Sequence, residues 1–393
     1  MENKLSKIYG KLCLTGVFYQ AVQKPLFQAF ERYCLAEAAY EKRKAYAAFV
    51  SEIYENGGDL TALVFRILSE DENGYVKGLA TNEPPDKNVE SSAQRELGIF
   101  SEFALLTAKD FAEDMGLPLA EIPSFTSFNA DMGAMYGERM QNIHKHGYGI
   151  FSSRCMFRLT DEGEIEPIVS ADKIGVGQFI GYEEERGKVI DNTQAFVDGR
   201  PAANVLLCGD AGTGKSSTVK AVANAFFKEG VRLIEIRKDQ LRSLPLVMAK
   251  ISGNPLKFII FIDDLAFNKN NDDFSMLKAA LEGSASAMAD NAVIYATSNR
   301  RHIVKESFKD RDGDDVHIND TLQETLSLSE RFGLTVLFSK PDKKLYLSIV
   351  RELAKRNGIS MDEKELELRA EEFALRKGSR SARGAEQFIN SLL

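Results

Sequence analysis

The second half of the chain alternates short, nearly continuous apolar runs with longer stretches in which apolar residues recur every three or four positions. The runs are rich in Val, Ile, Leu and Phe, and they cover residues 205–207, 231–236, 258–262, 292–296 and 334–338. Such runs are typical of strands buried on both faces, and most of the stretches between them have the spacing of helices. The pattern predicts a parallel five-stranded sheet with helices on both faces, whose ligand lies at the carboxyl ends of the strands.

The first part of the chain shows mainly the helical pattern. Helical spacing extends from about residue 15 to residue 145, with one long segment that follows Pro25 and ends at Gly57-Gly58. Another helix is expected from about Ser91 to Met115. The aromatic residues in these segments have the spacing of a buried core, and nothing in this part of the sequence indicates chemistry.

Two further patterns flank the predicted sheet. Residues 148–169 alternate between apolar and polar positions around the turn Asp161-Glu-Gly163, which predicts a β-hairpin. Beyond Pro341 the strand signals stop, and the remaining residues fit three short helices. We therefore expect a helical N-terminal domain over residues 1–146, an α/β domain with a leading hairpin over residues 147–340, and a small helical lid over residues 341–393.

A glycine-rich segment joins the first apolar run to the helix that follows it. Gly209-x-x-x-x-Gly214-Lys215-Ser216 has the spacing of a phosphate-binding loop. In such a loop backbone N–H groups surround the phosphates, the lysine contacts the β- and γ-phosphates, and the hydroxyl holds Mg²⁺. The residues expected to bind the nucleotide are Gly209, Asp210, Ala211, Gly212, Thr213, Gly214, Lys215, Ser216 and Ser217.

Two carboxylates follow the third apolar run. Asp263 and Asp264 stand where phosphoryl transfer requires one acid beside the metal and one that orients the attacking water. Asp263 is the predicted Mg²⁺-side acid, together with Ser216, and Asp264 is the predicted catalytic acid. An ordinary acidic turn after a buried strand is the alternative, and the phosphate-binding loop upstream favours the functional interpretation.

Other polar residues follow or precede the later strands. Asn299 ends the run Ala296-Thr-Ser-Asn299, and it would lie beside the two carboxylates if the third and fourth strands were neighbours. From there it could sense the γ-phosphate. Arg331 precedes the fifth strand, and Arg380 and Arg383 lie at the start of the last helix. Ordinary surface charge is the alternative for each arginine.

Five segments occur in an order that resembles the AAA+ ATPases, from about Phe179 to the C-terminus, and within them an uncharacterised bacterial family, the domain of unknown function 815 family. The hairpin and the N-terminal helices look similar to those of this family as well. The segments are Phe179-Ile-Gly-Tyr-Glu183, Gly209-Asp-Ala-Gly-Thr-Gly-Lys-Ser216, Phe261-Ile-Asp-Asp-Leu265, Ala296-Thr-Ser-Asn-Arg-Arg-His302 and Leu328-Ser-Glu-Arg-Phe-Gly333.

The resemblance implies an oligomer and a role for several residues. A homo-oligomer is expected, either a ring or a helix, with a hexamer as one candidate. Most AAA+ proteins carry Asp-Glu where this chain has Asp263-Asp264, and this departure puts the efficiency of hydrolysis in question. The implied roles are sensor 1 for Asn299, a finger acting on a neighbouring subunit's nucleotide for Arg331, sensor 2 for Arg383 with Arg380 as the alternative, and walls of the adenine pocket for Phe179 and Ile180.

The composition narrows the choice of partners. A net charge of −8 gives no global basic field, so nucleic acid stays an option that the charge does not indicate. The small basic cluster of Arg237, Lys238 and Arg242 could contact DNA, but the solvated start of a helix is the favoured interpretation. Four cysteines without Cys-x-x-Cys spacing fit a reducing cytosol. With neither an apolar leader nor a run long enough to cross a membrane, a cytoplasmic protein without a membrane partner is expected.

Three functions of different classes fit these observations. The first is an oligomeric ATPase that uses ATP and Mg²⁺ to remodel a protein or nucleoprotein, with an unknown protein partner held by the N-terminal helices. The second is a nucleotide-controlled scaffold with slow turnover, and the third is a DNA-handling ATPase similar to a helicase loader. The AAA+ resemblance favours the first. Turnover distinguishes it from the second, and stimulation by DNA would indicate the third.

Overall fold

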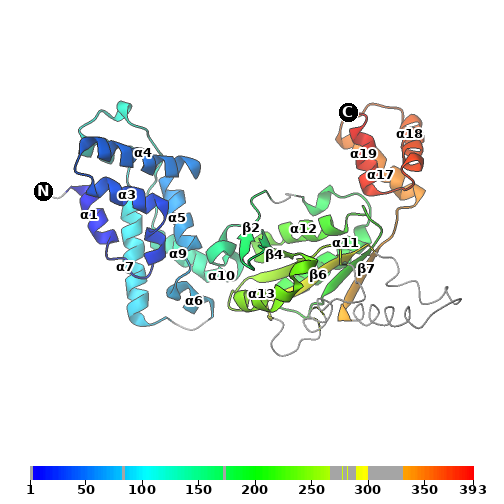
Figure 1. The fold of residues 1–393 in the computed structure, drawn as a ribbon, viewed down its shortest axis with the longest axis horizontal. Coiled ribbons are helices and arrows are strands. Elements are labelled where there is room, and N and C mark those ends of the chain that lie inside the picture. The colour runs from blue at the N-terminus through cyan, green and yellow to red at the C-terminus, as the bar shows by residue number, and fades with distance from the viewer. Residues whose placement is uncertain are drawn as a thin grey trace. The chain divides into compact units, whose positions relative to one another are not determined.

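The chain divides into two compact units in the computed structural model (Figure 1). The first unit comprises Met1–Ser153 with Gly253–Pro255, and the second comprises Arg154–Ser252 with Leu256–Leu393. The structure describes residues 3–81, 85–170, 174–265, 277, 281, 289–299 and 331–393.

The first unit is helical in the part of it that the structure describes. Its core is built from aromatic side chains, such as Phe30, whose ring packs edge-on against Phe103 with centroids 4.9 Å apart. The elements are α1 (Lys4–Leu12), α2 (Tyr19–Val22), α3 (Pro25–Leu35), α4 (Ala39–Glu55), α5 (Leu60–Glu70), α6 (Gly74–Ala80), α7 (Lys87–Ala104), α8 (Ala108–Met115), α9 (Met132–Gln141) and α10 (Ile143–His146), with short 3₁₀ turns η1 (Leu119–Glu121) and η2 (Gly149–Ser152).

Two of the predicted helices are each divided in the structure. The segment after Pro25 forms α3 and α4, because Ala36 and Ala38 have extended backbones, and the turn lets α4 fold back on α3 to bury the aromatic faces of both. The helix predicted from Ser91 to Met115 ends at Ala104, and α8 begins after Thr107. There the Asp110 carboxylate accepts the Thr107 N–H at 2.8 Å, which caps a new helix. Apolar spacing alone did not predict either break.

The second unit contains one seven-stranded sheet. The five predicted strands are confirmed as β3 to β7, which pair in parallel in the order β4-β5-β6-β3-β7. The predicted hairpin, β1 and β2, joins the same sheet, because β1 pairs in parallel with β4 and β2 pairs antiparallel with β1. The strands are β1 (Met156–Leu159), β2 (Ile165–Pro167), β3 (Val205–Gly209), β4 (Val231–Ile236), β5 (Lys257–Ile262), β6 (Ala292–Ser298) and β7 (Leu334–Phe338).

Helices cover this sheet and form the lid. Apolar residues of α11 and α12 pack on one face of the sheet, and α13 lies on the other (Figure 1). The last three helices pack around a core of their own that includes Tyr346 and Phe388. This confirms the expected α/β phosphate-loop fold with a helical N-terminal part and a small helical lid. The elements are η3 (Val176–Gln178), α11 (Glu183–Val197), α12 (Lys215–Ala225), η4 (Phe227–Glu229), η5 (Lys238–Ser243), α13 (Leu244–Ile251), α17 (Lys343–Arg356), α18 (Glu363–Arg376) and α19 (Ala382–Asn390).

Candidate functional site

The glycine-rich loop leaves β3 at its carboxyl end and leads directly into α12. Gly209, Gly212 and Gly214 all have positive φ, at 138°, 74° and 90°, a region that favours glycine. A Cβ on Gly209 would lie only 2.0 Å from the carbonyl oxygen of Phe338 on β7, so no side chain fits there. The same carbonyl accepts the N–H of Asp210 at 3.2 Å. The loop backbone and the start of α12 thus have a turn geometry in which backbone N–H groups could surround an anion.

Lys215 lies beneath this loop with only 5% of its surface exposed. Its Nζ donates hydrogen bonds to the carbonyl oxygens of Gly209 at 3.0 Å and Asp210 at 2.7 Å, and to Oδ1 of Asn299 at 2.9 Å. Burial lowers the pKa of the ammonium, and the nearby Asp210 acts in the opposite direction. All three acceptors are uncharged, so a phosphate oxygen in the loop would supply the buried charge with a counterion.

Asp263, at the carboxyl end of β5, accepts hydrogen bonds from two hydroxyl groups. Ser216 Oγ donates to Oδ1 of Asp263 at 2.6 Å, and Thr297 Oγ1 donates to the same oxygen at 2.5 Å. The strand register explains the second contact, since Ile262 of β5 pairs with Ala296 of β6. A serine hydroxyl beside a carboxylate is the oxygen donor set with which phosphate-loop enzymes hold Mg²⁺, so these residues fit that ion.

Asn299 joins the lysine to the second carboxylate. Its Oδ1 accepts the Lys215 bond, and its Nδ2 donates to Oδ1 of Asp264 at 2.7 Å. Asp264 has a φ of 52°, a left-handed conformation that is uncommon for a residue other than glycine. Because β6 lies between β5 and β3, the structure brings Lys215, Asn299 and Asp264 into one hydrogen-bonded chain.

A pocket of about 190 Å³ adjoins the loop on the side of the lid. Phe179 and Ile180, the predicted adenine walls, line it together with Thr213 and Ser217 of the loop region. Arg186 of α11 also lines the pocket and stacks over the Phe179 ring, with the guanidinium carbon 5.3 Å from the ring centroid. The pocket thus has an aromatic and apolar wall beside the phosphate-binding loop, as a nucleotide base requires.

The two lid arginines have different partners. Arg380 makes a two-pronged ion pair with Glu371 of α18, at 3.0 and 2.7 Å. Arg383 lines the pocket, and its N–H donates to the carbonyl oxygen of Gly212 in the loop at 3.3 Å. Of the two candidates for sensor 2, Arg383 is therefore the one beside the phosphate-binding loop.

Arg331 lies at the amino-terminal ends of the parallel strands, whereas this loop lies at their carboxyl ends. It precedes Leu334, which begins β7 and pairs with Val205, whereas the loop follows Gly209, which pairs with Phe338. At about 3.3 Å per residue, the length of β7 separates these two ends of the strands by roughly 16 Å. The structure therefore does not bring Arg331 to the site of its own chain.

Sequence reasoning missed Thr297 and Arg186 as site residues. Thr297 stands in the quoted run before Asn299, and the strand register of β5 and β6 was the information needed to place its hydroxyl between the two acids. Arg186 follows three glutamates on α11 and reads in the sequence as part of a solvated helix face. It is buried in the structure, and burial lowers its pKa.

Comparisons with known proteins place the chain in a family. A family model described as "Protein of unknown function (DUF815)" matches residues 152–393. Two solved structures from Thermotoga maritima, the RuvB Holliday junction branch migration motor and a point variant of it, match at 14% and 15% identity. Each match covers 56% of this chain and 72% of the other, with a TM-score of 0.34. No curated protein matches. No helix in the described parts of the chain is long and apolar enough to span a membrane. Because the family model covers more than half of its residues, the chain belongs to the DUF815 family that its motifs indicated.

Proposed function

We propose that this protein is an AAA+ ATPase that binds ATP with Mg²⁺ and hydrolyses it to ADP and phosphate within a homo-oligomer, to remodel a protein or nucleoprotein partner. One observation carries the proposal: Asn299 bonds both Lys215 and Asp264, at 2.9 and 2.7 Å. The Lys215 ammonium, which would bind phosphate, and the Asp264 carboxylate, which would orient water, are thereby linked at the carboxyl ends of the strands. Hydrolysis of a nucleoside triphosphate requires this combination.

The proposed chemistry assigns one task to each residue. Lys215 binds the β- and γ-phosphates, and Ser216 with Asp263 would hold Mg²⁺, which when bound neutralises charge on the phosphates. Asp264 orients a water molecule and accepts its proton as the water oxygen bonds to the γ-phosphorus. The bond from that phosphorus to the bridging oxygen breaks, and ADP leaves. Asn299 and Arg383 contact the γ-phosphate, while Phe179 and Ile180 enclose the base.

Two substitutions test the nucleotide site because they should fail in different ways. Lys215→Ala removes the charge beneath the loop and should weaken ATP binding itself. Asp263→Ala should mainly remove the part of the affinity that depends on Mg²⁺, together with hydrolysis. Titration calorimetry with ATP, with Mg²⁺ and with a chelator, measures both effects.

Lys220→Ala is a matched control on the same helix. Lys220 contacts Glu235 on β4 at 3.3 Å, away from the loop, so its loss should leave ATP affinity unchanged. If Lys215→Ala binds and hydrolyses ATP like the wild type, the site assignment is wrong.

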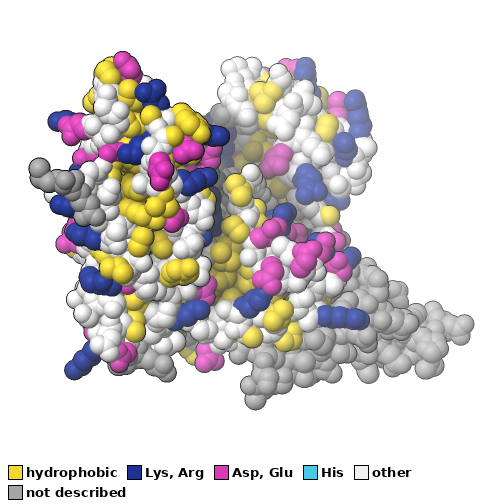
Figure 2. Space-filling view, turned by 60° about the vertical axis from the view of Figure 1, so that its left-hand side comes forward, with side chains coloured by type: hydrophobic (Ala, Val, Ile, Leu, Met, Phe, Trp, Pro, Cys, Tyr) yellow, Lys and Arg dark blue, Asp and Glu magenta, His cyan; other side chains and the backbone are white. Residues whose placement is uncertain are grey.

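The N-terminal unit is the proposed docking part of the molecule. Figure 2 shows hydrophobic side chains between charged ones on one face of this unit. Leu14, Leu35 and Tyr40 are exposed large hydrophobic residues of the unit. Such residues are a means of holding a protein partner. Affinity capture with the full chain carrying Asp264→Asn, which should bind ATP without hydrolysing it, tests this; a partner must be retained with ATP and lost when the helical unit is removed.

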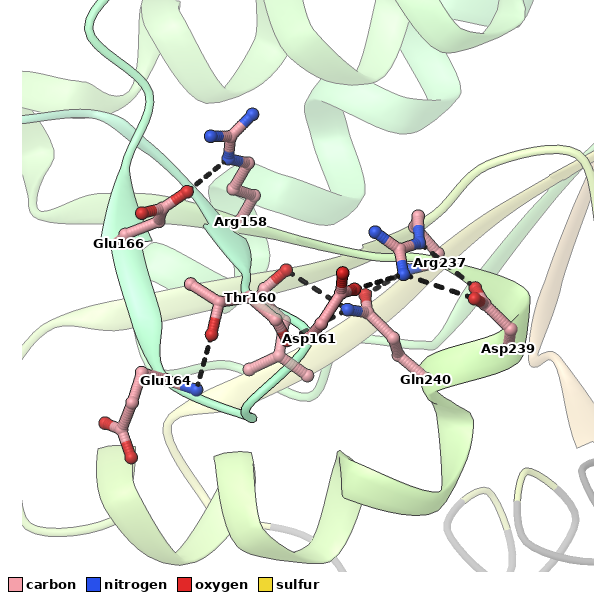
Figure 3. Close-up of polar contacts among 9 residues, drawn as sticks. Arg158, Thr160, Asp161, Glu164, Glu166, Arg237, Asp239 and Gln240 are labelled. Carbon is pink, nitrogen blue, oxygen red and sulfur yellow. Dashed lines mark hydrogen bonds and ion pairs between the residues drawn. The ribbon is translucent and has the colours of Figure 1, made fainter.

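The DNA-handling alternative receives less support. Figure 3 shows Arg237, the first residue of the small basic cluster, between two carboxylates. Its Nη2 lies 2.6 Å from Oδ1 of Asp161 at the hairpin turn, and its Nε lies 3.1 Å from Oδ1 of Asp239. A guanidinium paired in this way has little charge left to offer a phosphate backbone.

A further inference from the structure

Thr297, near the end of β6, bonds three successive residues of the segment that follows β5. Its hydroxyl donates to Oδ1 of Asp263 at 2.5 Å and accepts the N–H of Asp264 at 2.9 Å. Its carbonyl oxygen accepts the N–H of Leu265 at 2.7 Å. The residue is only 2% exposed, so water is not an alternative partner for these groups. One side chain thus contacts both acids of the site.

The second of these contacts supports an unusual backbone. Asp264 has a φ of 52°, which costs conformational energy for a residue with a side chain, and such a conformation persists only where neighbouring bonds maintain it. The bonds from Asp264 N–H and Leu265 N–H to Thr297 lie on either side of this turn. This turn sets the direction of the Asp264 carboxylate, whose Oδ1 accepts a hydrogen bond from the side-chain amide of Asn299.

We propose that Thr297 is a positioning residue for both carboxylates. Its hydroxyl fixes the Asp263 oxygen that Ser216 also binds, and it holds the left-handed turn from which Asp264 is presented. The inference rests on the proposed function, because the two acids matter only if the site hydrolyses a nucleotide. Thr297 itself does not touch the reacting atoms and acts through the acids.

A hydroxyl is the group that can do this in the available space. It donates one hydrogen to a carboxylate and accepts a backbone N–H at the same time. Valine has the same shape and can do neither, serine can do both, and cysteine, which replaces the hydroxyl with a thiol, forms only weak hydrogen bonds. The order of activity among these variants therefore reports on the hydroxyl and not on the volume of the side chain.

A purely structural role would give a different result. If Thr297 only satisfied a buried N–H group, Thr297→Val would lower stability and leave the kcat of the folded protein unchanged. A positioning role requires a lower kcat and a weaker effect of Mg²⁺ on ATP affinity, with ATP affinity in chelator unchanged. A displacement of about 1 Å can cost on the order of 10²-fold in rate, so we expect that loss in kcat.

The experiment compares Thr297→Val, Thr297→Ser and Thr297→Cys in the full chain. It measures kcat and KM for ATP, together with the Kd for ATP in Mg²⁺ and in chelator. We expect Thr297→Ser to recover most of the wild-type kcat and Thr297→Cys to lie between serine and valine. Thr193→Val is the control, because Thr193 is fully buried on α11 and bonds Tyr295 away from the site; it should retain wild-type kcat.

Two outcomes would overturn the inference. One is a folded Thr297→Val protein with the kcat and Mg²⁺ dependence of the wild type. The other, which remains measurable if Thr297→Val does not fold, is equal kcat for Thr297→Ser and Thr297→Cys. Failure of the proposed function is distinguishable from both, since the wild-type protein would then show no ATP turnover in the same assay.

Discussion

Both units bury charged side chains, but they use them differently. In the helical unit Glu96 is 1% exposed, and its two carboxylate oxygens accept the N–H groups of Gly16, Val17 and Phe18 at 2.9, 3.2 and 3.0 Å. In the second unit Lys215 is almost as buried, and its ammonium donates hydrogen bonds to two backbone carbonyls and to the side-chain amide oxygen of Asn299. Glu96 accepts the N–H groups of three successive residues, whereas Lys215 bonds acceptors from the glycine-rich loop and from the end of β6.

The comparison shows two different ways in which a buried charge can be hydrogen-bonded. Glu96 fixes the entry of the chain into α2, and its contacts are complete without any other molecule. Lys215, at the start of α12, shares the Asn299 side chain with Asp264, which follows β5, so its hydrogen bonds link three separate segments. Burial alone does not distinguish Glu96 from Lys215, but the residues with which each side chain forms hydrogen bonds do.

The largest effect is expected at Arg331, which extends the comparison beyond one subunit. Arg331→Ala should lower ATP hydrolysis by about 10³ to 10⁵, the range of arginine fingers in related chemistry, while ATP binding stays normal. The physical reason is that Arg331 would neutralise charge on a neighbouring subunit's γ-phosphate. Turnover and ATP affinity measured on the same preparation check this.

Mixing shows whether Arg331 acts in trans. Arg331→Ala and Lys215→Ala proteins, each nearly inactive, should regain activity together, because one subunit supplies an intact pocket and the other an intact arginine. Absence of recovery at every mixing ratio would contradict action between subunits.

A smaller effect is expected at Asp264, where the comparison concerns reach. The Asp264 side chain is one methylene shorter than the glutamate most AAA+ proteins carry, but its left-handed backbone and its 2.7 Å bond to Asn299 support a site built around the shorter acid. Asp264→Glu should therefore crowd the site and lower single-turnover hydrolysis, by on the order of 10²-fold.

Asp264→Asn is the control for that measurement. It should bind ATP and Mg²⁺ through Lys215, Ser216 and Asp263 and lose turnover. A rise in turnover on Asp264→Glu would instead mean that the wild-type site hydrolyses slowly and uses ATP mainly as a switch.

The smallest effect is expected in the helical unit. Glu96→Gln replaces a charged acceptor with an amide whose NH₂ would face backbone N–H groups, and hydrogen bonds to charged groups contribute about 1.5–3 kcal/mol. We expect the free energy of unfolding of this unit to fall by about 2 kcal/mol in urea denaturation, with ATP affinity unchanged. The matched control is Glu102→Gln, since the exposed pair of Glu102 and Lys11 should contribute less than about 1 kcal/mol. Equal losses for both variants would contradict the structural role of Glu96.

Much of the second unit could be predicted from the sequence because the patterns that indicate its strands and its glycine-rich loop are local. The glycines of the loop, the apolar runs and the acids after β5 each depend on a few consecutive residues, and the parallel sheet follows from their alternation with helices. The breaks at Ala36 and Thr107 could not be predicted from spacing, because apolar periodicity continues through them. They depend on which aromatic faces meet and on one capping carboxylate.

The unpredicted parts of the site depend on contacts between distant segments. Arg380 and Arg383 lie on the same short stretch, and the sequence could not choose between them because the choice depends on Glu371, a residue of another helix. The contribution of Thr297 depends on the register between β5 and β6, and that of Arg186 depends on its stacking with Phe179.

The five residues of β7 carry a mechanical consequence. Arg331 precedes the strand, and the carbonyl of Phe338 at its other end accepts the Asp210 N–H and lies against Gly209, where no side chain fits. An extended strand resists stretching, so a pull on Arg331 would arrive at Phe338 with little loss. If Arg331 contacts a neighbouring subunit's nucleotide, as predicted above, β7 is the segment that connects this contact to the subunit's own glycine-rich loop.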